Sequence, residues 1–98
     1  MPIKNKEKLY NAQKHHRDII KSNVIRYLES HPCVDCGEKN PLVLDFDHRD
    51  PSTKFKPISR LRSGTYGWIL IKKEIDKCDV RCANCHRIRT HSQRALSN

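Results

Sequence analysis

The chain has 98 residues, of which 36% are hydrophobic and 6% aromatic, and its formal net charge is +9. A chain this small and polar excludes a large hydrophobic core, so we expect one small domain that needs an additional stabilising element. No apolar stretch approaches the length of a membrane span and nothing resembles a signal peptide, so we expect a cytoplasmic protein with no membrane partner. The charge favours nucleic acid as the partner, with a ribosomal or merely soluble basic protein as the alternative.

The first expected element is a long basic helix over residues 4–30. This stretch contains no glycine or proline, and Ile20, Val24 and Leu28 recur at helical spacing. Seven lysines and arginines against three acids occupy the other faces. Pro32 ends the helix, because a proline disfavours helical backbone in the residue before it.

Shorter elements follow along the chain. The alternating stretch PLVLDFDH predicts a strand over residues 42–48, and the proline-containing residues 49–65 are expected to form a loop. Helical spacing of apolar residues predicts a short helix over 67–78. The sequence DVRC then suits a brief second strand over 79–82, and residues from Asn84 onward, free of helix breakers, predict a final helix.

Two Cys-x-x-Cys motifs are the most specific feature of the sequence. Cys33 and Cys36 form the first pair, and Cys82 and Cys85 form the second, with 45 residues between the pairs. Two such turns present four thiolates, the ligand set of a structural zinc site. Redox pairs and disulfides are the alternatives; the first usually occur as a single motif, and the second are rare in the cytosol. Zinc binding would contribute folding free energy on the order of 10 kcal/mol.

Cys78 is left over from these two motifs. On the expected helix it shares the apolar face of Trp68, Ile71 and Ile75, which predicts a buried structural thiol. A spare metal ligand is the alternative.

The stretch LDFDHRDP, residues 44–51, crowds acids around His48 in an otherwise basic chain. Zinc binding would bring this strand near His86, which directly follows the zinc ligand Cys85. The carboxylate of Asp47 and the imidazole of His86 suit a second, labile divalent ion bound chiefly through phosphate oxygens and water. A neutral His48 beside them suits general-base activation of water.

The chain resembles the HNH endonuclease family in three features taken together. These are the two Cys-x-x-Cys motifs, DFDH at the end of a strand and CxxCH at the start of a helix. The resemblance covers roughly residues 33–91. It implies a small α+β zinc-stapled domain in which residues 32–98 form a ββα-metal core and residues 1–31 form a basic helix packed on it. It also implies metal-dependent hydrolysis of double-stranded DNA, leaving 5′-phosphate and 3′-hydroxyl ends. Relatives of phage or bacterial type imply packaging-terminase proteins as partners.

By this resemblance, His48 is the general base, while Asp47 and His86 hold a catalytic Mg²⁺ or Mn²⁺ ion. One departure concerns the middle asparagine of the family name, which helps to orient the general base. No asparagine occurs between Asn40 and Asn84. Either another side chain or the backbone therefore orients His48, or the base is less well oriented and the activity weaker.

Other polar residues receive weaker assignments. Asp45 shares the strand face of Asp47, which favours a structural salt bridge over metal binding. His91 is a candidate contact to phosphate or metal, whereas His15, His16 and His31 are expected to be exposed or packed. Expected phosphate contacts, which position DNA without reading sequence, are Arg60, Arg62, Arg87, Arg89, Arg94, Lys54 and Lys56.

The leading hypothesis is therefore an HNH endonuclease that cuts one or both DNA strands. The main alternative is a non-catalytic zinc-stabilised DNA-binding or adaptor module, which the missing asparagine favours. A ribosomal zinc ribbon would explain the charge and the cysteines, but it gives no reason for the DFDH stretch or for a histidine next to Cys85.

Overall fold

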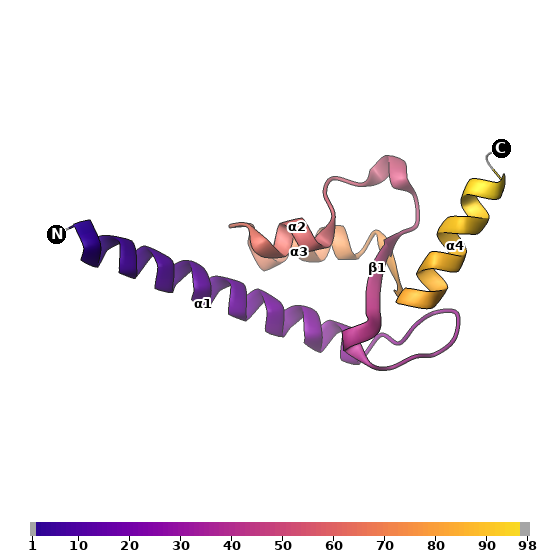
Figure 1. Cartoon of the computed structure of the whole chain (residues 1–98), viewed down its shortest axis with the longest axis horizontal. Coiled ribbons are helices and arrows are strands. Elements are labelled where there is room, and N and C mark those ends of the chain that lie inside the picture. The colour runs from indigo at the N-terminus through magenta and orange to yellow at the C-terminus, as the bar shows by residue number, and fades with distance from the viewer. Residues whose placement is uncertain (1, 97–98) are drawn as a thin grey trace.

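Residues 2–96 are described by a computed structural model, with side chains for residues 8–95 (Figure 1). The protein is a small mixed α/β structure with a two-stranded sheet. Its elements in chain order are α1 (Pro2–Glu29), β1 (Leu44–His48), α2 (Ile58–Ser63), α3 (Trp68–Ile75), β2 (Cys78–Cys82) and α4 (Ala83–Leu96), with 3-10 turns at Pro41–Val43 and Pro51–Thr53.

Helix α1 is the long helix that the sequence predicts. Its residues Ile20, Val24 and Leu28 are 2%, 1% and 5% exposed, so they form the stripe that packs on the rest of the molecule. The N-terminal half of α1 extends away from the other elements (Figure 1). At the other end, the His31 ring donates from Nδ1 to the Tyr27 carbonyl, 2.7 Å away, and thereby satisfies one of the last carbonyls of the helix.

The sheet pairs β1 with β2 in antiparallel register. Leu44 lies opposite Cys82 at one end, and His48 lies opposite Cys78 at the other. The strand starts two residues later than predicted, because Pro41–Val43 forms a 3-10 turn. Since side chains alternate along a strand, Asp47 and His48 point to opposite faces of β1.

Two other expectations are wrong in detail. Residues 49–65, expected as a loop, contain helix α2, which buries Ile58 and Leu61 at helical spacing. Cys78, expected on the helix of Trp68, is instead the first residue of β2. Its thiol is nevertheless buried, as predicted, because the chain turns from α3 back toward the sheet within the core.

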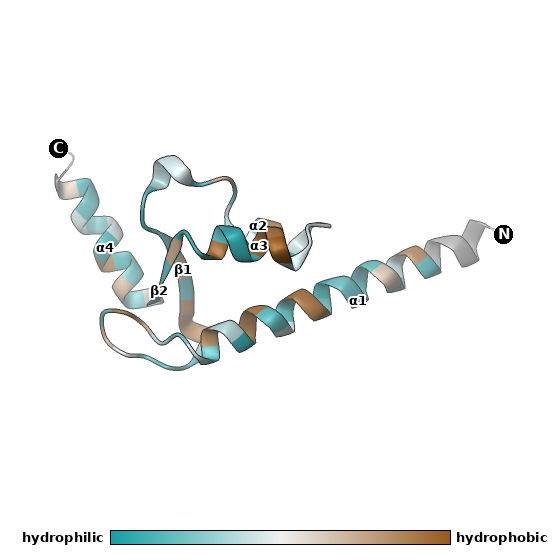
Figure 2. Ribbon diagram, turned by 180° about the vertical axis from the view of Figure 1, so that it is seen from behind, coloured by the Kyte–Doolittle hydropathy of each residue, from teal (hydrophilic) through white to brown (hydrophobic). Residues whose placement is uncertain are grey.

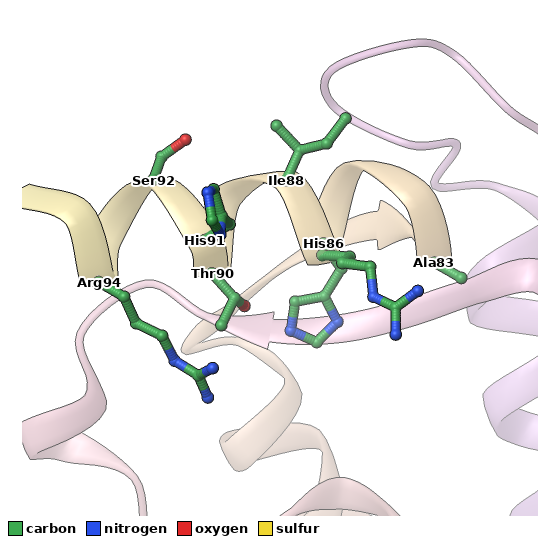
Figure 3. Close-up of a pocket in the computed structure, with 8 residues that line it drawn as sticks. Ala83, His86, Ile88, Thr90, His91, Ser92 and Arg94 are labelled. Carbon is green, nitrogen blue, oxygen red and sulfur yellow. The ribbon is translucent and has the colours of Figure 1, made fainter.

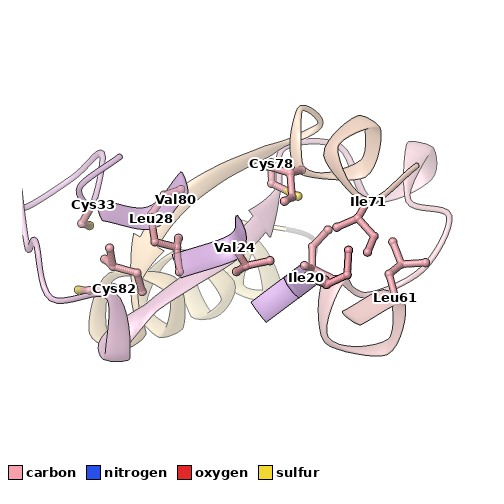
Figure 4. Close-up of a cluster of buried hydrophobic side chains, with 12 residues drawn as sticks. Ile20, Val24, Leu28, Cys33, Leu61, Ile71, Cys78, Val80 and Cys82 are labelled. Atoms are coloured by element: carbon pink, nitrogen blue, oxygen red, sulfur yellow. The ribbon is translucent and has the colours of Figure 1, made fainter. Parts of the chain in front are cut away.

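One hydrophobic cluster connects all these elements. Figure 4 shows Cys33 and Cys82 at one end of the cluster and Leu61 and Ile71 at the other, with side chains of α1 between them. Each fully buried Leu or Ile contributes about 1.5–3 kcal/mol relative to an exposed position. This cluster fixes the sheet against α1, and so sets where the polar ends of β1 and β2 lie.

Helix α4 starts immediately after β2 and is mostly hydrophilic, in contrast to the hydrophobic segments of α1 and α3 (Figure 2). Its Ile88 is 64% exposed. The helix is therefore held mainly through its first turns. Across the part of the chain that the structure describes, no helix combines the length and apolar character needed to span a membrane.

Candidate functional site

Four cysteine thiols meet beside the sheet, and we call them the cysteine cluster: Cys33, Cys36, Cys82 and Cys85. Their Sγ atoms all lie within 4.8 Å of one another. The first two come from the loop after α1, the third ends β2 and the fourth lies in the first turn of α4. Among residues 8–95, no other three or more Cys, His, Asp or Glu side chains gather in this way.

The local backbone places N–H groups close to the cysteine sulfur atoms of the cluster. Gly37 has a φ of +79°, which glycine adopts without strain, and its N–H donates to the Cys33 carbonyl at 2.9 Å. The N–H of Cys85 points at the Cys82 Sγ, 3.4 Å away. Burial raises the pKa of the Cys33 thiol, but nearby backbone N–H groups outweigh it and lower the pKa to about 6.

The thiols oppose one another's ionisation. Hydrogen bonding to the Cys82 thiol, followed by burial, raises the pKa of Cys85 well above its usual range. A divalent cation removes this conflict because it stabilises all four thiolates at once. The predicted cluster is thus confirmed as a potential zinc site, with the number and kind of ligands that tetrahedral structural zinc prefers.

Asp47 lies farther along the sheet and is only 8% exposed. Its Oδ2 accepts hydrogen bonds from Arg81, at 3.0 Å, and from Arg89, at 2.6 Å. The two guanidinium groups neutralise the buried carboxylate and fix its orientation. Its other oxygen, Oδ1, lies 3.6 Å from Nε2 of His86.

His86 reaches this carboxylate from the first turns of α4, and Figure 3 shows its ring directed toward β1. Its Nδ1 lies 3.2 Å from Asp45 Oδ2, so the ring is placed between two carboxylates of one strand face. Asp45 therefore pairs with His86 in the structure. We call Asp47 and His86 the acid–histidine pair; one cation with bonds of about 2.1 Å can contact both of the facing atoms.

His48 points away from this pair, toward α3. Its Nε2 lies 2.7 Å from Oε2 of Glu74, and the two side chains are 9% and 4% exposed. Oε2 of Glu74 also accepts the N–H of Phe55 at 3.0 Å, and Oε1 accepts Lys77 Nζ at 2.9 Å. Burial raises the pKa of the Glu74 carboxyl, but the ammonium of Lys77 and the other donors outweigh it and hold the pKa at about 2.

His48 and His86 nevertheless border the same surface hollow, whose volume is about 540 Å³. The hollow lies between α1, β1, α2 and the start of α4. Its charged lining consists of Lys21, Lys54 and Arg62 together with one carboxylate, Asp45, and apolar side chains line most of the rest. The arrangement places two imidazoles in a basic depression that favours an anionic ligand.

The remaining predicted contacts to phosphate divide into two groups. Arg60 and Arg87 are exposed. Lys56 instead donates to the Tyr66 hydroxyl at 2.7 Å, and Arg89 donates to Asp47 and to the His48 carbonyl. Binding of phosphate by any of them stays a prediction.

A second, open depression runs along the outer face of α4 and is shown in Figure 3. Arg87, His91 and Arg94 line it together with small polar residues. No carboxylate is among its lining residues, so it suits contact with an anion better than binding of a metal.

Sequence reasoning missed Glu74 and Arg81. Glu74 follows Ile71 by three positions and precedes Ile75, so helical spacing alone places this acid on the buried face of α3. Arg81 alternates with two buried residues of β2 and lies opposite Asp45 in the register, but the pairing of the strands was not available from sequence.

Comparisons of the chain with protein-family models, with curated proteins and with solved structures found no match. The arrangement of side chains therefore carries the functional argument.

Proposed function

We propose that this protein is a metal-dependent DNA endonuclease with an HNH-type ββα-metal core. The observation that carries the proposal is the acid–histidine pair, in which Asp47 Oδ1 and His86 Nε2 face each other at 3.6 Å beside a hollow that His48 also lines. Two antiparallel strands followed by a helix, with cysteines at the junction, support the same reading.

Each side chain has a distinct part in the proposed reaction. Asp47 and His86 hold the divalent ion, and when bound this ion stabilises the charge that develops on the phosphate and on the leaving 3′ oxygen. His48 accepts a proton from the attacking water, which is the general-base role that a neutral imidazole suits. Arg81 and Arg89 hold the Asp47 carboxylate by Oδ2, which leaves Oδ1 facing His86.

DNA is the proposed substrate because cations surround the hollow. Lys21, Lys54 and Arg62 line it, while Arg87 on α4 and Arg60 on α2 are exposed on neighbouring elements. Such groups attract the phosphate backbone without selecting a sequence. The zinc ion proposed at the cysteine cluster acts on folding and takes no part in the chemistry.

A second candidate is a non-catalytic DNA-binding module. The contacts of Asp47 favour it, because two arginines already neutralise this carboxylate without any metal ion. The two candidates agree on binding of DNA and differ only in cleavage.

The deciding experiment incubates zinc-loaded protein and supercoiled plasmid with Mg²⁺, with Mn²⁺ or with neither. We expect nicked or linear DNA only when the divalent ion is added, and none from a His48→Ala variant with unchanged zinc content and circular dichroism. A folded wild-type protein that binds the plasmid but leaves it intact with both ions would favour the binding module.

A further inference from the structure

Glu74 is a buried acid with no part in the proposed reaction so far, and it contacts His48. Glu74 is 3% exposed, and such burial of a carboxylate is unfavourable unless its partners compensate. Two of these partners are Lys77 and the Phe55 N–H, which contact the carboxylate independently of any histidine. The third partner is Nε2 of His48, at 2.7 Å.

Hydrogen-bond chemistry fixes the tautomer of His48. An ionised carboxylate has no proton to donate, so Nε2 of His48 must carry the proton in this contact. In the neutral ring, the lone pair is then on Nδ1. Glu74 thus determines which ring nitrogen can accept a proton.

The surroundings of Nδ1 support this assignment. Nδ1 of His48 has no hydrogen-bond partner among the side chains that the structure describes, and within the same range no buried side-chain nitrogen or oxygen lacks a partner. Nδ1 is therefore the ring atom that keeps contact with solvent. The residue lines the basic hollow that it shares with His86, where a water and a phosphate group have access.

Resting on the proposed function, we propose that Glu74 is the positioning residue of the general base: its Oε2 holds the His48 ring by Nε2–H and directs the Nδ1 lone pair into the hollow. A side chain of α3 thereby orients the general base. The sequence offers no asparagine for this role, since none occurs between Asn40 and Asn84. Glu74 itself does not touch the substrate.

Three variants separate this role from a purely structural one. Glu74→Met keeps the approximate size but removes the acceptor, Glu74→Gln keeps an acceptor oxygen, and Lys77→Met removes another partner of Glu74 without altering His48. Plasmid cleavage is measured with saturating divalent ion, giving kcat and KM separately. Zinc content and circular dichroism are recorded for each variant.

We expect Glu74→Met to lower kcat on the order of 100-fold, the scale of a general base that is lost or misaligned, with KM changed by less than about threefold. Glu74→Gln should recover to within about tenfold of the wild type, and Lys77→Met to within about threefold. A folded, zinc-containing Glu74→Met variant with wild-type kcat would overturn the role of Glu74 while leaving the endonuclease proposal intact. Absence of cleavage by the wild type would instead remove the endonuclease proposal, and with it the reaction that Glu74 serves.

A second measurement decides the orientation even if Glu74→Met fails to fold. Long-range ¹H–¹⁵N correlation spectra of the imidazoles identify the tautomer of each neutral ring, and a His48→Asn variant assigns the signals. We expect the wild-type His48 to carry its proton on Nε2, and Glu74→Gln to keep that tautomer. A wild-type ring protonated on Nδ1 would overturn the inference.

Discussion

The two ends of the small sheet solve opposite electrostatic problems. At the end where Leu44 faces Cys82, four thiols gather, and a divalent metal would allow all four to ionise together. At the other end, Asp47 and Glu74 are buried, but Arg81, Arg89 and Lys77 already neutralise them. We therefore expect one end to depend on a metal for folding, whereas the other end is neutralised by side chains and would bind a metal only in the proposed reaction.

Removal of zinc is the largest perturbation that this contrast predicts. Chelation, or Cys82→Ser, should unfold the chain, because the loss on the order of 10 kcal/mol exceeds what a small core retains. Circular dichroism and metal analysis measure both effects. Cys78→Ser is the matched control and should keep one zinc per chain; zinc-free protein that stays folded would break the comparison.

Substitution of the acid–histidine pair should separate activity from zinc binding. We expect Asp47→Asn to lower kcat by at least about 100-fold and to cost on the order of 2 kcal/mol of unfolding free energy, because Arg81 and Arg89 lose a charged partner. Zinc content should not change. Asp45→Asn, on the same strand face but exposed, serves as the control and should retain most of the cleavage.

The two neighbouring arginines of α4 should differ in kind. Arg89 contacts Asp47, so Arg89→Met should lower kcat and destabilise the fold by about 1–2 kcal/mol. Arg87 is exposed, so Arg87→Met should weaken DNA binding and reduce the slope of log K against log salt by about 1, with kcat unchanged. Equal effects of the two substitutions on kcat would contradict the assignment of Arg89 to Asp47.

The smallest expected effect is the change in stability on substitution of Cys78, and it depends on pH. Burial, and then the charge of Glu74, raises the pKa of its thiol to about 11 from an ordinary value near 9. A raised folded-state pKa gives stability that is complete below about pH 9 and is lost as the pH rises toward 11. The free energy of unfolding of the wild type should exceed that of Cys78→Ala by about 1–2 kcal/mol at neutral pH. Denaturant titrations should show this difference shrinking between about pH 9 and 11. A difference that stays constant would contradict burial of the thiol.

Local patterns in the sequence predicted the parts of the fold that depend on local spacing. The stripe of α1 and the two cysteine motifs belong to this class, and both were found as expected. Helix α2 was missed because six residues are too few to show a helical period. The partnership of His48 with Glu74 joins positions 26 residues apart, and only the packing of α3 against β1 reveals it.

The charged residues of the candidate site also divide into those that local sequence indicates and those that only the packing reveals. The crowding of acids beside His48 was visible in the sequence and indicated a metal platform. Its neutralisation by Arg81 and Arg89 depends on strand register and on the start of α4, neither of which the sequence defines.

The central claim is that the acid–histidine end binds an exchangeable divalent ion distinct from the zinc at the cysteine end. Titration of the zinc-loaded protein with Mn²⁺, followed by paramagnetic broadening of the imidazole resonances, tests it most directly. The account predicts that the His86 signal broadens first, that Asp47→Asn abolishes this effect, and that one zinc stays bound throughout. Broadening that is unchanged in Asp47→Asn, or that accompanies release of zinc, would contradict it.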